Sequence, residues 1–410
     1  MTAASLPGLR TSIVVMSAFA VVSDAVLIAF YPQFFAQRYG MTSAFHVGAY
    51  IAAISIAVMF TLPLWARVAK RVETMSLLLY TQCAAGMLCA ASYWADSVIA
   101  YWVLTMAMFM CKSSYLLMYP YLMRLEKPED HAHTIGLLSV VVYLGGIFGA
   151  VAGGWVLQAA GPAACLWLMA AGDFAQMFVC AWLIRSGRAV KVLSGSDAEP
   201  APAAQKPWWS VATRRVLQLS LVVAVFDFAA YLIRPFFSVY WEQVSPSSLP
   251  VQTGLVFAIP GTVALAALVI GKRSRRRFDH VIANLLLGAV GLLLQAAPSE
   301  PAILAGRVLY GWALFQLIVK FEVILFRLST PEAYARDFSV FNFFQNLGVL
   351  LSSFAAGALV GRFGAGITFV VAAGGLLLTA ALDRLLLRPD RAPAADPAPL
   401  DPLGATPHAN

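Results

Sequence analysis

The residues of this sequence that could do chemistry are a few charged side chains inside long apolar stretches. Asp24 lies in VSDAVLIAFYPQFF, Asp227 lies in VFDFAAYLIRPFFSVYWE, and Glu322 lies in a later apolar stretch. Desolvation favours the neutral form of a carboxyl group, so such an acid can be neutral in one state and ionised in another. We interpret these three residues as proton-binding groups, with structural pairing to a neighbouring cation as the alternative. Asp173 is a weaker candidate, and we expect it to pair only structurally.

Lys112 is a cation inside the apolar stretch MCKSSYLLMY. On an α-helix Lys112, Tyr115 and Tyr119 would share one face and present a cation beside two phenol groups to a substrate. A salt bridge between Lys112 and Asp24 is an equally good interpretation. The two interpretations are compatible, because a substrate anion or a proton could break the pair.

The second half of the sequence offers three further substrate-binding residues, Arg234, Gln316 and Lys320. Arg234 follows Asp227 by seven residues, so a helix would place both on one face, about two turns apart. They would not touch, but they could contact opposite ends of a ligand. Gln316 and Lys320 are spaced i, i+4. These cations favour a small anionic or zwitterionic substrate, such as a carboxylate-bearing metabolite, a metallophore or a drug.

Other kinds of chemistry find little support. The five histidines lie at the ends of apolar stretches, in loops or in the tail, and there is no H-E-x-x-H or G-x-x-x-x-G-K-[ST] pattern. The five cysteines lie in apolar segments without metal-ligand spacing. We therefore expect no catalytic residue, no metal and no cofactor. A membrane-embedded enzyme or a scaffold is the least favoured class of function.

Composition indicates the elements that position these side chains. Of the 410 residues 60% are hydrophobic and 12% are charged, and the mean hydropathy is +0.77. Apolar stretches of about 20 residues, the length that spans a bilayer, recur along the whole chain. We predict an all-α integral membrane protein with twelve transmembrane helices. They lie at 12–35, 46–66, 75–94, 98–123, 134–158, 162–185, 212–240, 250–270, 279–297, 302–327, 336–360 and 366–387.

The distribution of basic residues predicts the orientation. If the N-terminus is cytoplasmic, 22 of the 28 Lys and Arg residues fall on the cytoplasmic side. This bias follows the positive-inside rule and predicts that both termini are cytoplasmic and that the protein lies in the plasma membrane. It also accounts for the net charge of +8 without a nucleic-acid partner.

The two halves of the sequence repeat each other at a constant offset of 203 residues. This offset relates Asp24 to Asp227 and Pro32 to Pro235, and it relates four further pairs: Phe34 and Phe237, Gly145 and Gly348, Gly154 and Gly357, and Gly161 and Gly364. The repeat predicts two pseudo-symmetric six-helix bundles, at 1–190 and 212–387. A Pro-, Ala- and Ser-rich cytoplasmic linker at 191–211 joins them, and a disordered cytoplasmic tail follows at 388–410.

Glycines and prolines mark places where the helices pack closely or bend. The fifth predicted helix contains GGIFGAVAGGW, with Gly145, Gly149, Gly153 and Gly154. Small residues at this spacing let another helix approach closely. Pro32 and Pro235 lack an N–H group and loosen the helix around them, which suits a helix that flexes during gating.

Twelve spans in two repeats, with a basic loop after the second and eighth helices, resemble the major facilitator superfamily (MFS) of secondary transporters. GGIFGAVAGGW is similar to the family's antiporter motif G-x-x-x-G-P-x-x-G-G, with Ala150 at the proline position. LPLWARVAKRVE keeps the basic residues of the family's loop motif but lacks its Asp and glycines. GRVLYGWA, with Arg307 and Gly311, is weakly similar to a motif that the family has in its fourth helix.

The resemblance implies transport by alternating access around a central site in a monomer, with protons as the coupling ion. The antiporter motif favours export, and proton-coupled uptake of a small organic solute is the alternative. The small-molecule substrate and the lipid bilayer are then the only partners expected.

Overall fold

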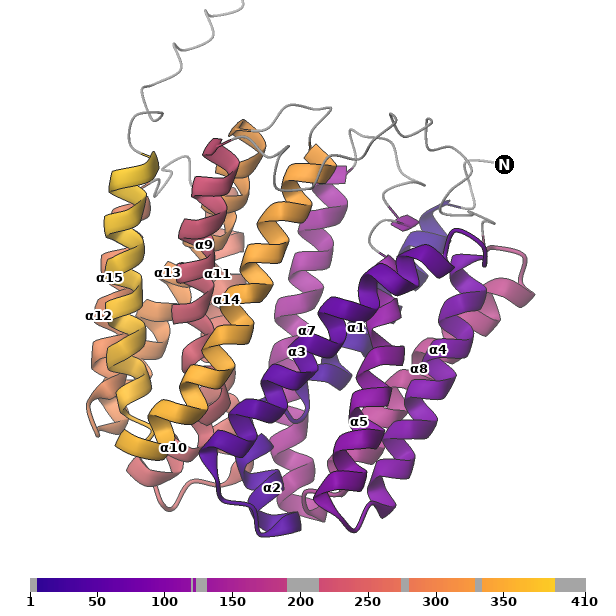
Figure 1. Cartoon of the computed structure of the whole chain (residues 1–410), viewed down its shortest axis with the longest axis horizontal. Helices are drawn as coiled ribbons and strands as arrows, with labels where there is room; N and C mark the ends of the chain where they lie inside the picture. Colours follow the sequence, from indigo (N-terminus) through magenta and orange to yellow (C-terminus); the bar gives the residue numbers. More distant parts are fainter. Residues whose placement is uncertain are drawn as a thin grey trace, which may run out of the picture.

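The computed structural model describes residues 6–118, 121–122, 131–189, 214–273, 280–328 and 334–387, which are mostly helical. The N-terminal half contains α1 (Leu6–Ala25), α2 (Tyr31–Tyr39), α3 (Ala44–Val68), α4 (Thr74–Ala91), η2 (Ser92–Trp94), α5 (Val98–Lys112), η3 (Ser113–Leu117), α7 (His131–Ala160) and α8 (Ala164–Arg185). The C-terminal half contains α9 (Arg214–Leu232), η6 (Arg234–Phe236), α10 (Phe237–Val244), α11 (Pro250–Arg273), α12 (Val281–Ala296), α13 (Glu300–Leu328), α14 (Tyr334–Phe363) and α15 (Ile367–Leu387). Figure 1 shows the two halves side by side as two bundles.

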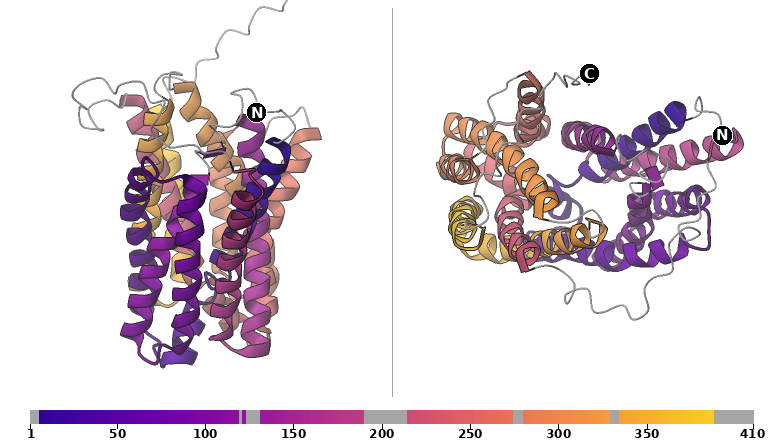
Figure 2. Two further views of the ribbon diagram at one scale, coloured as in Figure 1. Left: turned by 90° about the vertical axis from the view of Figure 1, so that its right-hand side faces the viewer. Right: turned by 90° about the horizontal axis from the view of Figure 1, so that it is seen from above.

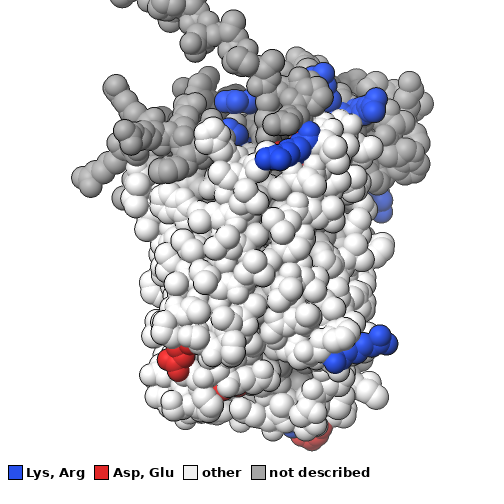
Figure 3. Space-filling view, turned by 90° about the vertical axis from the view of Figure 1, so that its left-hand side faces the viewer, with Lys and Arg blue, Asp and Glu red and all other residues white. Residues whose placement is uncertain are grey.

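The helices present an apolar surface of the kind that faces lipid. Within the described residues, eleven segments are long and apolar enough to cross a membrane, and α12 is a shorter apolar helix at the place of the ninth predicted span. Large apolar side chains such as Phe60, Ile99 and Phe178 are 77%, 77% and 65% exposed, which suits contact with acyl chains. In Figure 3 the middle of the face shown has almost no charge, and most blue side chains gather at one end. The predicted all-α membrane fold with two bundles is confirmed.

The first and seventh predicted spans are each broken, where the sequence suggested continuous helices. The first span ends as α1 at Ala25, residues 26–30 form turns, and α2 starts at Tyr31. Pro32 lies in the first turn of α2, where its missing N–H costs nothing. The seventh span breaks in the same way between α9 and α10, where Pro235 occupies the short 3-10 helix η6. Pro235 cannot donate to the carbonyl four residues earlier, that of Tyr231, which accounts for the end of α9 at Leu232.

The glycines of the fifth span pack against the first. A Cβ atom on Gly149 would lie 2.5 Å from the Ala25 Cβ, and one on Gly145 would lie 2.8 Å from the Val21 Cγ1. Gly153 lies against the backbone of Val26. Because real Cβ atoms do not come this close, these glycines allow α7 to contact the backbone of α1.

The two halves contact each other at the end of the bundle that carries α2 and α10, here called the α2–α10 end (Figures 1 and 2). Gly48 at the start of α3 lies against Gly357 and Ser353 near the end of α14. Gly154 near the end of α7 lies against Pro250 at the start of α11. These contacts between glycine and backbone hold the two halves together at this end.

Side-chain hydrogen bonds also connect the two halves at the α2–α10 end. Gln33 of α2 donates from Nε2 to Glu242 Oε1 of α10 at 3.0 Å, and its Oε1 accepts from Ser238 Oγ at 3.1 Å. Gln33 is buried, so these bonds form away from water. The amide of one residue therefore links α2 of the first half to α10 of the second.

Candidate functional site: a cavity between the two halves

A cavity of about 240 Å³ lies between the halves and is lined by both of them. Its charged lining residues are Asp24 and Lys112 from the N-terminal half and Arg234 from the C-terminal half. The remaining lining is aliphatic, aromatic or hydroxyl-bearing, and it includes Tyr115 and Tyr231. A mostly apolar cavity with a few charged groups is typical of a small-molecule site.

Breaks in the helices position all three charged residues. Asp24 is the second-last residue of α1, Lys112 is the last residue of α5, and Arg234 begins η6. Backbone that leaves the α-helix inside a membrane protein is tolerated where it lines a cavity or is buried in protein. The breaks therefore occur where the chain presents its charged groups to the cavity.

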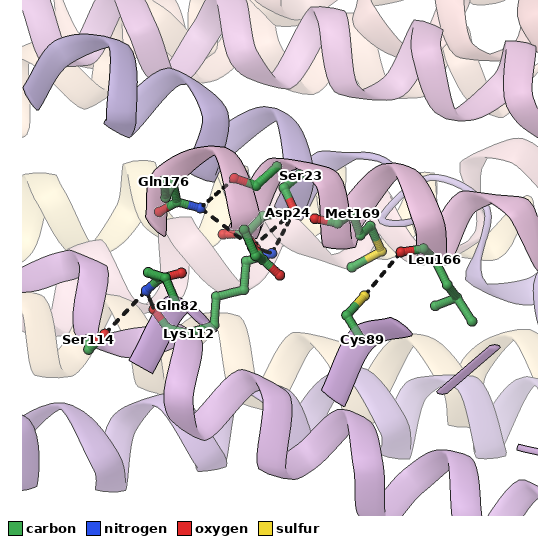
Figure 4. A network of polar contacts seen from close by, with 11 residues as sticks. Ser23, Asp24, Gln82, Cys89, Lys112, Ser114, Leu166, Met169 and Gln176 are labelled. Carbon is green, nitrogen blue, oxygen red and sulfur yellow. Dashed lines mark hydrogen bonds and ion pairs between the residues drawn. The ribbon is translucent and has the colours of Figure 1, made fainter. Parts of the chain in front are cut away.

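Lys112 is shared by two carboxylates (Figure 4). Its Nζ lies 3.0 Å from Asp24 Oδ1 and 2.9 Å from Asp173 Oδ1, and it donates to Ser23 Oγ at 2.7 Å. The side chains of Lys112 and Asp173 are 2% and 0% exposed, whereas that of Asp24 is 33% exposed. Asp24 is thus the more exposed of the two carboxylates, and it lines the cavity.

Neighbouring polar groups hold this cluster in place. Ser23 Oγ donates to the Met169 carbonyl of α8 at 2.8 Å, which ties α1 to α8 beside the ion pairs. Gln176, one turn after Asp173, donates to Asp173 Oδ1 at 3.5 Å. Gln82 of α4 donates to the Lys112 carbonyl at 3.3 Å, at the end of α5. Four helices, α1, α4, α5 and α8, therefore fix the Lys112 environment.

The charge of the cluster is unbalanced. With Lys112 charged and both Asp24 and Asp173 ionised, the cluster carries one excess negative charge in a largely buried place. Uncompensated charge is costly there, and binding one proton removes it. The cluster would be balanced if one of its two carboxylates bound a proton.

Asp173 pairs with a cation, as the sequence suggested, and the structure identifies that cation as Lys112, which it contacts as closely as Asp24 does. The predicted helix around Lys112 differs from the structure. Residues 113–117 form the 3-10 helix η3, so the α-helical spacing assumed for Lys112 and Tyr115 does not apply, although both line the cavity. Tyr119 lies outside the described residues. Both Asp173 and Asp24 are acidic residues inside an apolar segment, so the same sequence feature identifies both as candidates.

Asp227, the repeat partner of Asp24, has different surroundings. It is 5% exposed, it hydrogen-bonds with Gln345, and its Oδ2 has no hydrogen-bond partner among the described residues. Arg234 interacts with it electrostatically but without an ion-pair contact in the described structure. The Arg234 guanidinium lies instead over the Tyr231 ring, 4.1 Å from the centroid. Arg234 and Pro235 line the cavity, whereas Asp227 is not part of its described lining.

Three further predicted residues lie on α13, away from the described lining of the cavity. Gln316, Lys320 and Glu322 are partly buried, and none of them is among the lining residues. Glu322 interacts electrostatically with Tyr143 of α7. The structure therefore does not bring these residues together with Asp24 and Lys112.

Arg307 is a buried cation that the sequence indicates only through a weak motif. Its Nε donates to the Val256 carbonyl of α11 at 3.1 Å, and its second nitrogen donates to the Phe257 carbonyl. Val256 lies four residues before Pro260, so its carbonyl cannot find the usual donor within α11. Arg307 supplies that donor from α13, and Gly311 lets α13 approach Pro260 closely.

No group of three or more His, Cys, Asp or Glu residues that could hold a metal occurs in the part of the chain that the structure describes.

Curated relatives and solved structures agree on the kind of protein. The Multidrug resistance protein MdtG of Klebsiella pneumoniae (strain 342) is 25% identical over 274 residues, which is 64% of this chain and 64% of that protein. The match therefore spans less than two thirds of this relative's length.

Three solved structures share the fold at low sequence identity. A bacterial homologue of the human lysosomal transporter Spinster, in an inward-facing and occupied conformation, matches with a TM-score of 0.77 at 13% identity, covering 95% of this chain and 98% of that one. A point mutant of the nucleoside transporter NupG matches with a TM-score of 0.71 at 14% identity, over 92% of this chain and 100% of that one.

The human organic anion transporter MFSD10 (TETRAN) matches with a TM-score of 0.65 at 15% identity, covering 91% of this chain and 98% of that one. The model of the Major Facilitator Superfamily itself matches residues 13–290 and 272–408. With its two helical bundles and a cavity between them, the chain belongs to the Major Facilitator Superfamily and is a membrane transporter rather than an enzyme.

Proposed function

We propose that the protein exports a small amphipathic organic molecule in exchange for protons, by alternating access. The observation that carries the proposal is the sharing of buried Lys112 between Asp24 and Asp173, with Asp24 open to the cavity. A cluster with one excess negative charge can bind a proton in one state and lose it in another. Because Asp24 lines the substrate cavity, a substrate and a proton would compete for the same carboxylate.

The described contacts between the halves support one state of such a cycle. The contacts of Gly48, Gly154 and Gln33 between the halves lie at the α2–α10 end, and α7 and α11 also meet nearer their middle at Ile147 and Gly261. The basic residues gather at the end opposite α2 and α10 (Figure 3). If the basic end is cytoplasmic, as the positive-inside rule predicts, the closed end faces outward. The state is then inward-facing, and both termini are cytoplasmic. Rocking of the bundles would break the contacts at the α2–α10 end and expose the cavity to the outside.

The direction of transport rests on two similarities. The GGIFGAVAGGW segment is similar to the antiporter motif, and the curated relative MdtG is called a multidrug resistance protein. Both favour export over uptake.

The α7 glycines would connect the proton site to the rest of the bundle. Gly145, Gly149 and Gly153 pack against Val21, Ala25 and Val26, next to Asp24. A movement of α1 on protonation of Asp24 would therefore also move α7.

The test uses purified protein in proteoliposomes and everted membrane vesicles, screened with labelled amphipathic acids, zwitterions and amines. We expect an acid-inside gradient in everted vesicles to drive accumulation of at least one compound, with measurable proton release. Asp24→Asn should abolish this coupling while the protein remains folded and inserted. Full coupled transport by Asp24→Asn would contradict the proton assignment. Accumulation only in right-side-out vesicles would instead support proton-coupled uptake.

A further inference from the structure

Arg234 is the charged group of the cavity that remains open to a ligand. Among the described residues it has no carboxylate in ion-pair contact and no hydrogen-bond acceptor, and its guanidinium lies over the Tyr231 ring. A cation–π contact with an aromatic ring leaves the N–H donors of a guanidinium available for hydrogen bonds. Such a group is prepared to bind a planar anion such as a carboxylate.

Lys112, in contrast, has its donors engaged. Its Nζ contacts Asp24, Asp173 and Ser23 within 3.0 Å, which uses the three donors of an ammonium group. A substrate anion would have to displace a buried carboxylate to bind there. A substrate anion would therefore bind at Arg234, in the C-terminal half, and not at Lys112.

The N-terminal half contributes a negative group to the same cavity. Asp24 is 33% exposed and has a second carboxylate oxygen beyond the one that Lys112 contacts. The rest of the lining is mostly aliphatic and aromatic, with Ile54, Phe109 and Val349 among its members. A ligand with an apolar body would therefore find an acceptor at one end and a cation at the other.

The size of the cavity limits that body. Pockets for drug-sized ligands have volumes of roughly 300–1,000 Å³, and this cavity measures about 240 Å³. A single ring or a two-ring system with short polar arms is the appropriate size. We propose that Arg234, held on Tyr231, binds the carboxylate of a small aromatic acid or zwitterion, whose cationic or donor group, where present, lies toward Asp24.

This inference rests on the proposed function for its view of the cavity as a transport site, but its test needs no gradient. The probes are four indole compounds with one ring system: indole-3-acetate, its neutral analogue indole-3-acetamide, tryptophan and tryptamine. Binding to the purified full-length protein in detergent is measured by isothermal titration calorimetry. Indole-3-acetate and indole-3-acetamide differ little in shape, so their ratio of affinities reports the anion site.

We expect the wild-type protein to bind indole-3-acetate and tryptophan about tenfold or more tightly than indole-3-acetamide, as a hydrogen bond to a charged group implies. In Arg234→Gln the affinities for the acetate and the acetamide should become equal, and the affinity for the acetamide should stay within about twofold of the wild-type value. Arg234→Lys should keep part of the preference for the acetate. Arg362→Gln, which removes an exposed arginine at the end of α14, is the matched control and should change nothing.

Three results would overturn the inference. They are equal affinity for the acetate and the acetamide in wild type, an unchanged ratio in Arg234→Gln, and no binding of any of the four compounds at millimolar concentration. Asp24→Asn should weaken tryptamine more than indole-3-acetate, and the reverse order would contradict the assigned orientation. If the protein prefers the acetate but shows no proton-coupled transport in vesicles, the proposed function fails and this inference stands. If it shows proton-coupled transport but no preference for the acetate, this inference fails and the proposed function stands.

Discussion

The two halves of the protein place an aspartate at equivalent positions and give it different surroundings. Asp24 and Asp227 are 203 residues apart. At the same offset, Lys112 corresponds to Phe315 and Asp173 corresponds to Leu376, both buried apolar residues. The N-terminal half therefore has a shared cation and two carboxylates at this place, whereas the equivalent place in the C-terminal half has buried Asp227 beside Gln345. The comparison shows that the two halves keep an aspartate at equivalent backbone positions but surround it with different side chains.

The packing of the halves has stayed closer to symmetric. Gly154 contacts Val251 of the other half, and Gly357 contacts Gly48. Gly357 follows Gly154 by 203 residues, and Val251 follows Gly48 by the same number. The same contact thus occurs twice, once in each direction across the interface. The glycine contacts at the interface are thus formed by equivalent residues of both halves, whereas we expect proton binding in the N-terminal half alone.

The largest expected effect is the loss of the shared cation. Lys112→Ala leaves Asp24 and Asp173 facing each other without compensation, and removing one partner from a buried ion pair costs about 3–5 kcal/mol. We expect a large drop in the thermal unfolding temperature in detergent. The double variant Lys112→Ala/Asp173→Asn should recover part of that loss, and failure to recover any would contradict the charge-balance argument. A selective loss of affinity for anions alone would instead make Lys112 a substrate ligand.

Asp227→Asn tests whether the second carboxyl group is required for coupling. Because one of its oxygens has no hydrogen-bond partner in the described structure, the amide should fit with little loss. We expect coupled proton flux in proteoliposomes to persist and the unfolding temperature to stay the same or rise. Asp24→Asn, measured in parallel, should lose that flux. Equal loss in both variants would mean that the two halves share the proton chemistry.

Gly48→Ala tests the contact that closes the α2–α10 end. A Cβ there would lie 2.5 Å from the Ser353 carbonyl oxygen, and such overpacking costs about 1–3 kcal/mol. Spin labels at the exposed residues Gln37 and Gln243 should show a longer distance between α2 and α10 in the variant. Gly146→Ala is the matched control, because a Cβ at Gly146 meets nothing within 4 Å. An unchanged distance distribution would show that this contact does not hold the closed state.

The smallest effect concerns the side-chain link between the halves. Gln33→Leu removes the hydrogen bonds to Glu242 and Ser238, each contributing about 1 kcal/mol. We expect a modest increase in the open population, read with the same labels at Gln37 and Gln243. A shift larger than that of Gly48→Ala would reverse the relative importance of the polar and glycine contacts.

Most of the architecture could be predicted from the sequence, because hydropathy and the repeat act over many residues at once. The breaks after Asp24 and before Arg234 were partly indicated by Pro32 and Pro235. The grouping of Asp173 with Lys112 could not be predicted. It depends on how α5 and α8 face each other in three dimensions, and neither helix has a clear polar stripe. Gln316, Lys320 and Glu322 had suitable side chains, but the rotation of α13 about its axis decides what they face.

The hydrogen bonds from Arg307 of α13 to the backbone of α11 have a mechanical consequence. The Val256 carbonyl, freed by Pro260, accepts from α13, so α11 is tied to another helix at the place where its own backbone hydrogen bond is missing. If α11 moved without α13, the guanidinium would lose its acceptors in a buried place, at a high energetic cost. The two helices are therefore expected to move as one stiff unit. Because α11 contacts α7 of the other half through Gly254, that unit would act as a lever that carries motion across the interface.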